Sequence, residues 1–183
     1  MRWRLIVGAA RELAEAEGWE AVTTRKLAEK VEYSQPVLYS HFKNMDAIAA
    51  AVALEGFEEL TALLTQGSER RRGQAGASEG TARLRRLAEA YLEFAREHPA
   101  LYRAMFVRQT QLTFATDENP ASLRATYDVF HAGVTPYAKG DAETLVELFW
   151  SSLHGLATLQ AGARLRPDHQ ENRVELLVRL IAG

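Results

Sequence analysis

The sequence predicts an all-α protein with a small N-terminal domain and a larger helical C-terminal domain. Apolar residues recur at spacings of three and four along nearly all of the 183 residues, which is the period of an amphipathic helix. Sustained alternation of apolar and polar residues, the pattern of a half-buried strand, is missing. We therefore expect nine helices and no strands, with one domain over residues 1–46 and a second over residues 47–183.

The composition is that of a folded, cysteine-free protein. Apolar residues make up 47% of the chain, which excludes general disorder, and its length allows a core without covalent cross-links. The absence of cysteine excludes disulfides and thiolate metal sites. A net charge of −2 argues weakly against nonspecific coating of nucleic acid, but a sequence-specific DNA reader needs only a local basic face.

Two apolar runs are too short to act as export or membrane segments. Residues 5–10 end at Arg11 and Glu12, short of the apolar core of a signal peptide. Residues 47–54 cannot span a bilayer. We expect a cytoplasmic protein without a membrane partner.

The N-terminal segment is predicted to form three short helices. Gly18 ends the first helix, Thr23 caps the second, and residues 32–34 connect the second to the third. The inward-facing residues are Ile6, Ala10, Leu13, Ala14, Leu27, Ala28, Val31, Val37, Leu38 and Phe42. Short helices joined by about three residues predict a helix-turn-helix over residues 23–43.

The outward face of the third helix carries side chains suited to DNA. Gln35 in its first turn can pair bidentately with adenine, and residues 33–43 contain no acid. Tyr39, His41 and Lys43 suit phosphate oxygens, and Arg25 can reach a phosphate or a guanine edge. A polar outer face is also found on any small helical bundle, so this pattern alone leaves DNA binding open.

Six further helices are expected after the helix-turn-helix. Asn44 can cap the first of them, and the others begin near Thr81, Pro99, Pro120, Asp141 and Pro167. Residues 66–80 hold four glycines and the run Arg70, Arg71, Arg72, which predicts a solvated loop.

Three strings of residues resemble the DNA-binding domain of the tetracycline-repressor (TetR) family. They are Gly18-Trp19, the run from Thr23 to Ala28, and the run from Ser34 to Asn44 with its Leu-Tyr-x-His-Phe-Lys sequence. The resemblance covers about residues 3–54. It implies that the positions facing DNA are Thr24, Arg25, Gln35, Pro36, Val37, Tyr39, Ser40 and His41.

The sequence departs from this family pattern at three places. Glu32 occupies the turn position where the family usually has glycine, and a left-handed conformation there would cost on the order of 1 kcal/mol. Met45 replaces a polar residue usually aimed at phosphate. The first helix begins almost at Met1, so this sequence does not contain the basic arm that usually precedes it.

The resemblance further implies that residues beyond 47 bind a small effector and dimerise. Large rings and a thioether are common linings of apolar pockets, although they also fill ordinary helical cores. The candidate ligand contacts are Phe57, Tyr91, Phe94, Tyr102, Met105, Phe106, Tyr127, Phe130, Trp150 and His154. We expect a small-molecule effector that is mainly apolar, and no cofactor.

The segment 142–162 is apolar on two sides, so we expect one side to meet a second copy of the chain. Its residues Trp150, His154 and Gly155 resemble the Trp-x-x-x-His-Gly signature of one C-terminal subgroup of these regulators. The candidate dimer contacts are Leu145, Phe149, Leu153, Leu156, Leu177 and Ile181.

Two other functions remain as alternatives. An enzyme is disfavoured because the sequence has no cysteine nucleophile, glycine-rich phosphate loop or His-Glu-x-x-His motif. The histidines His98, His131 and His154 lack the spacing of a helical metal clamp, so we expect no metal. A helical interaction module that has lost DNA binding is the second alternative, favoured by Glu32, Met45 and the missing arm.

Overall fold

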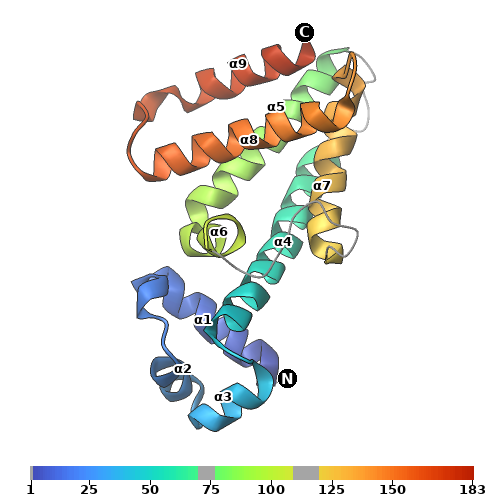
Figure 1. Cartoon of the computed structure of the whole chain (residues 1–183). Helices are drawn as coiled ribbons and strands as arrows, with labels where there is room; N and C mark the ends of the chain where they lie inside the picture. Colours follow the sequence, from blue (N-terminus) through green and yellow to red (C-terminus); the bar gives the residue numbers. More distant parts are fainter. Residues whose placement is uncertain (1, 70–76, 109–119) are drawn as a thin grey trace. The chain divides into compact units, whose positions relative to one another are not determined.

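The computed structural model describes residues 2–69, 77–108 and 120–183, and these ranges contain nine α-helices, three short 3-10 helices and no strand (Figure 1). The prediction of an all-α fold is confirmed. The α-helices are α1 (Arg2–Glu17), α2 (Thr24–Val31), α3 (Gln35–His41), α4 (Met45–Glu69), α5 (Ala77–Glu97), α6 (Pro99–Phe106), α7 (Ala121–Val134), α8 (Ala142–Ala161) and α9 (Gln170–Ala182). The 3-10 helices are η1 (Trp19–Ala21), η2 (Thr135–Tyr137) and η3 (Pro167–His169).

The chain forms two compact units. The first comprises residues 1–58 together with 98–123, and the second comprises residues 59–97 together with 124–183. The first unit therefore contains α6 in addition to α1, α2, α3 and the start of α4. The predicted functional boundary at residues 46–47 stays a prediction.

In the first unit, α1 buries one continuous face of small and branched side chains. These residues are Ile6, Val7, Ala9, Ala10, Leu13 and Ala14. The helix ends as expected at Gly18, whose φ of 84° is readily adopted only by glycine. The Gly18 N–H donates to the Ala14 carbonyl at 2.8 Å, which satisfies a carbonyl at the helix end.

The second helix has a side-chain cap at its start and a strained residue at its end. The Thr23 hydroxyl accepts from the Lys26 N–H at 3.3 Å, as predicted. Glu32 adopts φ 56° and ψ 36°, the left-handed conformation that glycine would adopt more easily. The Tyr33 N–H then donates to the Ala28 carbonyl at 3.0 Å, which closes the last turn of α2 in the manner of a Schellman motif. The turn therefore keeps the family geometry despite Glu32.

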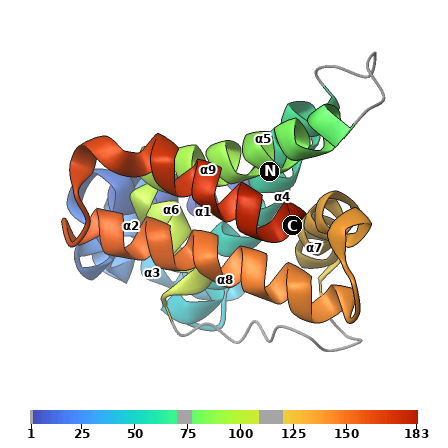
Figure 2. The same ribbon diagram turned by 90° about the horizontal axis from the view of Figure 1, so that it is seen from above.

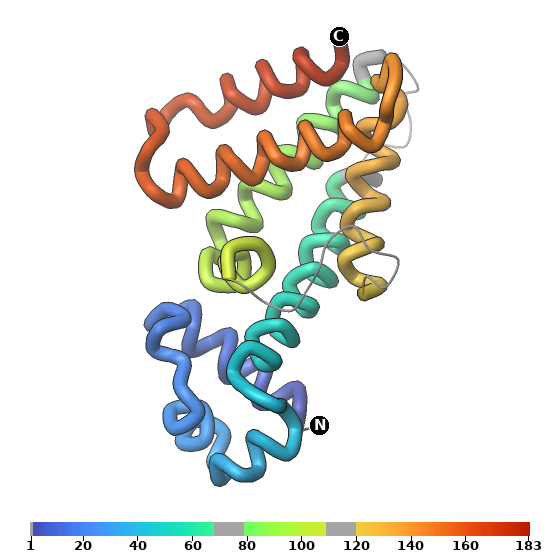
Figure 3. Tube along the Cα trace, in the orientation of Figure 1, coloured from blue at the N-terminus to red at the C-terminus, as the bar shows by residue number. Residues whose placement is uncertain are grey.

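Residues 32–34 form the short connection from α2 to α3 (Figure 3). The apolar side chains Leu38 and Phe42 are buried, and the Trp3 ring stacks on Phe42 with centroids 5.9 Å apart. Asn44 caps α4, because its Oδ1 accepts from the Ala47 N–H at 2.9 Å.

In the second unit, α5, α8 and α9 pack on one another, and α8 and α9 run side by side (Figure 2). A chain of rings forms part of its core: the Tyr91 and Phe130 centroids lie 5.8 Å apart, and those of Phe130 and Phe149 lie 6.1 Å apart. In both contacts the rings meet edge to face, an arrangement that aromatic pairs prefer. Asp141 caps α8 by accepting from the Glu143 N–H at 3.0 Å, as the sequence predicts.

The prediction of a loop over residues 66–80 is wrong for residues 66–69 and 77–80, which are helical. Helix α4 continues to Glu69 and α5 already begins at Ala77, while residues 70–76, including the arginine run, lie outside the described residues. The Arg86 Nε donates to the Gly67 carbonyl at 2.8 Å, and the Arg86 guanidinium pairs with Glu79 at 2.8 Å. These contacts support helix ends that the glycines alone would weaken.

No helix in the described ranges is both long enough and apolar enough to cross a bilayer.

Replacing Glu32 by glycine is expected to stabilise the protein by up to about 1 kcal/mol, because glycine removes the steric cost of the left-handed conformation. Urea unfolding followed by circular dichroism measures this. The control is Glu32→Ala, which removes the same charge but keeps Cβ and should give no such gain. Equal stabilisation by both variants would assign the effect to charge instead.

His154 of α8 is expected to make stability depend on pH. Burial lowers the pKa of its imidazole below the usual value, so the unfolded chain binds this proton more readily. The contribution of His154 to the free energy of unfolding is therefore complete above about pH 6.5, and it is lost as the pH drops below that value. Urea unfolding at pH 7.5, 6.0 and 5.0 should show a weaker loss for His154→Gln than for the wild type. The control is His41→Gln, which changes an exposed imidazole; an unchanged slope in His154→Gln would contradict the assignment.

Candidate functional site

The outward face of α3 is exposed along its whole length. Tyr39 is 52% exposed, whereas Val37 is partly buried. The exposed residues are Gln35, Pro36, Tyr39, Ser40 and His41. The Ser40 hydroxyl donates to the Val37 carbonyl at 2.7 Å, so it is held against the helix. These side chains lie opposite Leu38 and Phe42, which fix α3 to the rest of the unit.

The remaining predicted DNA contacts flank α3. Thr24 is the first residue of α2, where backbone N–H groups lack intrahelical acceptors, and it is partly buried. Arg25 is exposed, and its Nε lies 3.4 Å from the Glu29 carboxylate. Lys43 is exposed immediately after α3. The structure thus places all nine predicted DNA contacts in the first unit, on α2, on α3 or just after α3.

The two lysines of α2 are engaged by acids of α1. The Lys26 ammonium lies 2.6 Å from the Glu17 carboxylate, and that of Lys30 lies 3.0 Å from Glu12. The clustering of acids near the first helix is visible in the sequence, but their pairing with α2 is not. Arg25 and Lys43 remain the Arg and Lys side chains predicted to meet DNA.

The predicted ligand contacts fall into two groups, one in each unit. Phe57, Tyr102, Met105 and Phe106 belong to the first unit. There the Phe106 ring lies 5.2 Å from Phe57 and 4.9 Å from Tyr102, centroid to centroid. Gly56 of α4 permits the close approach of Met105 from α6, because a Cβ on Gly56 would lie 2.6 Å from the Met105 sulfur.

The second group comprises Tyr91, Phe94, Tyr127, Phe130, Trp150 and His154. The Trp150 indole N–H donates to the Tyr91 hydroxyl at 3.2 Å, and the Trp150 and His154 rings lie 6.1 Å apart. Tyr91, Phe94 and Phe130 are buried, whereas Tyr127 is 40% exposed. The structure therefore brings Tyr91, Phe130, Trp150 and His154 together and leaves Tyr127 nearer the surface.

Sequence reasoning missed a polar pair beside this second group. Thr126 is buried, and its hydroxyl lies 2.7 Å from that of Thr61, so that one donates to the other. Thr126 stands four residues before Phe130, and this helical spacing could have placed it on the inner face of α7. A buried hydroxyl pair can orient a polar group of a bound molecule.

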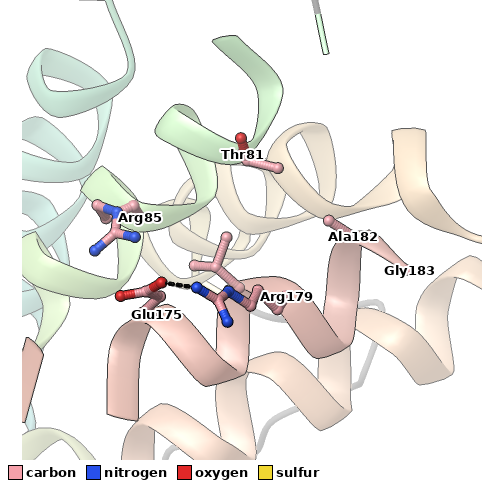
Figure 4. A pocket seen from close by; sticks show the side chains of 7 residues that line it. Thr81, Arg85, Glu175, Arg179, Ala182 and Gly183 are labelled. Atoms are coloured by element: carbon pink, nitrogen blue, oxygen red, sulfur yellow. Dashed lines mark hydrogen bonds and ion pairs between the residues drawn. The ribbon is translucent and has the colours of Figure 1, made fainter. Parts of the chain in front are cut away.

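A groove of about 420 Å³ lies between α5 and α9. Arg179 pairs with Glu175 along its edge, and Arg85 and Thr81 come from α5 (Figure 4). Its lining includes the charged residues Arg85, Glu175 and Arg179 and none of the predicted ligand contacts. Among the described residues, no cluster of three metal-ligating side chains is found.

The predicted dimer contacts on α8 need a correction. Phe149 and Leu153 are fully buried within the chain, so they cannot meet a second copy, whereas Leu145, Leu156, Leu177 and Ile181 remain partly exposed. The exposed leucines of these two helices are Leu148 and Leu159 on α8, and Leu176 and Leu180 on α9. The helix is apolar on two sides, and the sequence alone assigned the inner side to the partner.

Comparison with protein families gives two matches. Residues 6–52 match the profile of bacterial regulatory proteins of the tetR family. Residues 84–182 match the profile of the tetracyclin repressor-like C-terminal domain. The first match contains α2 and α3, and the second covers more than half of the chain. The resemblance to the Trp-x-x-x-His-Gly subgroup stays a prediction.

Individual relatives agree with these matches. The uncharacterized HTH-type transcriptional regulator YobS of Bacillus subtilis is 31% identical over 105 residues, covering 57% of this chain and 51% of the relative. This chain therefore aligns with about half the length of that relative. The uncharacterized HTH-type transcriptional regulator Rv0681 of Mycobacterium tuberculosis is 27% identical over 184 residues, covering 97% of this chain and 79% of the relative.

A solved structure of a protein of unknown function from Rhodococcus sp. RHA1 superimposes with a TM-score of 0.79 at 26% identity, covering 100% of this chain and 93% of the other. An N-terminal helix-turn-helix with an exposed reading helix, an all-helical remainder and two family matches agree with one another. The chain belongs to the TetR family of transcriptional regulators.

Proposed function

We propose that the protein is a homodimeric repressor that binds a palindromic operator and releases it when a small, mainly apolar effector binds. The observation that carries the proposal is the exposed, acid-free outer face of α3, which is held in place by the burial of Leu38 and Phe42. The proposal assigns no catalytic reaction to the protein, and it places the protein in the cytoplasm with the DNA that it reads.

The side chains divide into those that read bases and those that fix the register. Gln35 lies in the first turn of α3, where an amide can pair with the N6 and N7 of adenine. Tyr39, His41 and Lys43 contact phosphates, which orient the helix without reading sequence. Arg25 exchanges its exposed pairing with Glu29 for a phosphate or guanine contact, at little cost because exposed ion pairs are weak.

The exposed leucines of α8 and α9 support dimerisation. Leu148 and Leu180 are 56% and 80% exposed, and Leu159 and Leu176 lie on the same two helices. Several large exposed apolar side chains on two neighbouring helices favour an interface there. Gly155 lies on the same stripe of α8 as Leu148 and Leu159, and a Cβ on it would meet open space, so a second copy can approach closely there. A two-fold contact would join α8 and α9 of both copies in a four-helix bundle.

The effector is proposed to act by choosing between two conformations. Two recognition helices must lie about one DNA turn apart to enter successive major grooves. An effector that binds more tightly to a form with another separation lowers operator affinity, and it must differ in affinity between the forms to do so. The ring clusters around Tyr91 and Phe106 favour an apolar or aromatic effector.

Selection from random duplex DNA should enrich a palindromic site. Arg25→Ala should weaken binding to it by about 1–3 kcal/mol, the range for a side chain that contacts a base, and Tyr39→Ala should weaken binding to all sequences alike, as loss of a phosphate contact does. Electrophoretic mobility shift at several salt concentrations gives the affinities. The matched controls are Arg96→Ala and Tyr137→Ala, which make the same changes in the second unit and should bind as the wild type does. Absence of any enriched site would favour the interaction module that has lost DNA binding.

Replacing both Leu148 and Leu180 by glutamate is expected to convert the dimer to a monomer, because charges in an apolar interface are costly to bury. Sedimentation equilibrium measures the mass. Leu63→Glu, at an exposed leucine of α4, is the control and should leave the dimer intact. A dimer that survives the double substitution would rule out this face as the interface.

A further inference from the structure

The first turn of α6 contains two backbone N–H groups without an acceptor in their own helix. Pro99 has no N–H, and the Tyr102 N–H already donates to the His98 carbonyl at 2.8 Å. The N–H groups of Ala100 and Leu101 are therefore the donors that a cap must satisfy. The helix has no side-chain cap from its own N-terminal residue, His98.

One carboxylate from α1 satisfies both donors. Glu15 accepts from the Ala100 N–H at 3.1 Å through Oε2, and from the Leu101 N–H at 3.0 Å through Oε1. The acceptor lies 85 and 86 residues away in sequence. Its charge also meets the positive end of the helix dipole, and hydrogen bonds to an ionised acceptor are the stronger kind.

Two further contacts fix α6 within the same unit. The Trp19 indole N–H donates to the Ala100 carbonyl at 2.7 Å, and Trp19 is only 5% exposed. At the other end of α6, the Arg108 guanidinium lies 5.4 Å from the centre of the Trp19 ring. It also pairs with Asp46 at 3.2 Å, in the first turn of α4. The side chains of Glu15, Trp19, Arg108 and Asp46 therefore hold both ends of α6, and we call them the α6 clamp.

The other paired acids of α1 contact side chains and not backbone N–H groups. Glu12 and Glu17 pair with lysines of α2 in exposed positions, whereas Glu15 is partly buried and reaches backbone donors. Helix α1 thus contacts the helix-turn-helix through Glu12 and Glu17 and α6 through Glu15. The chain continues from α5 into α6 with only His98 between them, so Glu15 attaches α1 to the segment that leads directly from α5.

We infer that Glu15 is a positioning residue for DNA binding. Its carboxylate fixes the first turn of α6 on α1 and so joins α6 to the helices α1, α2 and α3 of the first unit. This inference rests on the proposed function. Specific binding requires both recognition helices of a dimer to hold a set separation, while nonspecific binding depends mainly on phosphate contacts. Loosening the α6 clamp therefore lowers operator affinity more than affinity for random sequence.

The test compares Glu15→Gln with Glu12→Gln in the full-length protein. Both variants remove one negative charge from α1, but only the first removes the bidentate cap, since an amide has one acceptor oxygen. Affinities for the selected operator and for random duplex of equal length are measured at one salt concentration. Hydrogen exchange at the amides of Ala100 and Leu101 reports on the cap itself.

Glu15→Gln is expected to lower the ratio of operator to random-sequence affinity about tenfold, the effect of losing one charged hydrogen bond, and to speed exchange of both amides. Glu12→Gln should leave the exchange of both amides unchanged and should lower the ratio far less than Glu15→Gln does, because Glu12 makes only an exposed pair with Lys30. Trp19→Phe, which keeps a ring beneath Arg108 but removes the donor to Ala100, should lower the ratio in the same direction.

Three results would overturn the inference. The first is a ratio in Glu15→Gln equal to that in Glu12→Gln. The second is an equal fall in both affinities, which is the sign of a smaller folded fraction. The third is a Glu15→Gln protein that does not fold together with an unchanged ratio in Trp19→Phe. If the wild type selects no operator, the proposed function fails, and protected amides in the wild type would still show that the cap exists.

Discussion

The first unit, which contains the helix-turn-helix, depends on the burial of one face of α1. Ile6, Val7 and Leu13 provide the apolar surface, each worth roughly 1.5–3 kcal/mol when fully buried. Ala10 and Ala14 keep that face flat, so neighbouring helices approach closely. Helix α2 packs on this helix directly, and so does α6. The position of α3 follows, because Phe42 packs against Trp3 near the start of α1.

The second unit combines a ring-filled core with an apolar surface. Tyr91, Phe130 and Phe149 interlock inside it, and the Tyr91 hydroxyl meets the Trp150 indole. On the outside, α8 presents Leu148 and Leu159. Helix α8 is therefore apolar on two sides, one that packs in the core of its own unit and one that remains exposed.

The sequence predicted the elements whose signals are local. Gly18, Thr23, Asn44 and Asp141 act within a few residues of their own position, and each marks the helix end that the structure has. The all-α fold follows from the same periodicity, and so does the exposure of the polar face of α3, because the position of Leu38 fixes which side faces inward.

The remaining features depend on partners that are far away in the sequence. The inner side of α8 could not be assigned because Phe149 and Leu148 are adjacent and equally apolar. The packing of α8 on α5 and of Phe149 against Phe130 decides between them. The extension of α4 rests on Arg86, nineteen residues beyond Gly67. Nothing near Glu15 distinguishes it from Glu12 or Glu17, since its acceptor role appears only when α6 packs on α1.

The pairing of Lys26 with Glu17 and of Lys30 with Glu12 has a consequence for how the protein finds its target on a chromosome. A genome offers on the order of a million or more competing random sites, and attraction to them grows with every phosphate that a cation neutralises. These exposed pairs are weak, but the two carboxylates beside the lysines lower the positive potential that this unit presents to phosphates. The first unit therefore spends less time bound to random sequence. A given number of protein molecules then searches more of the chromosome.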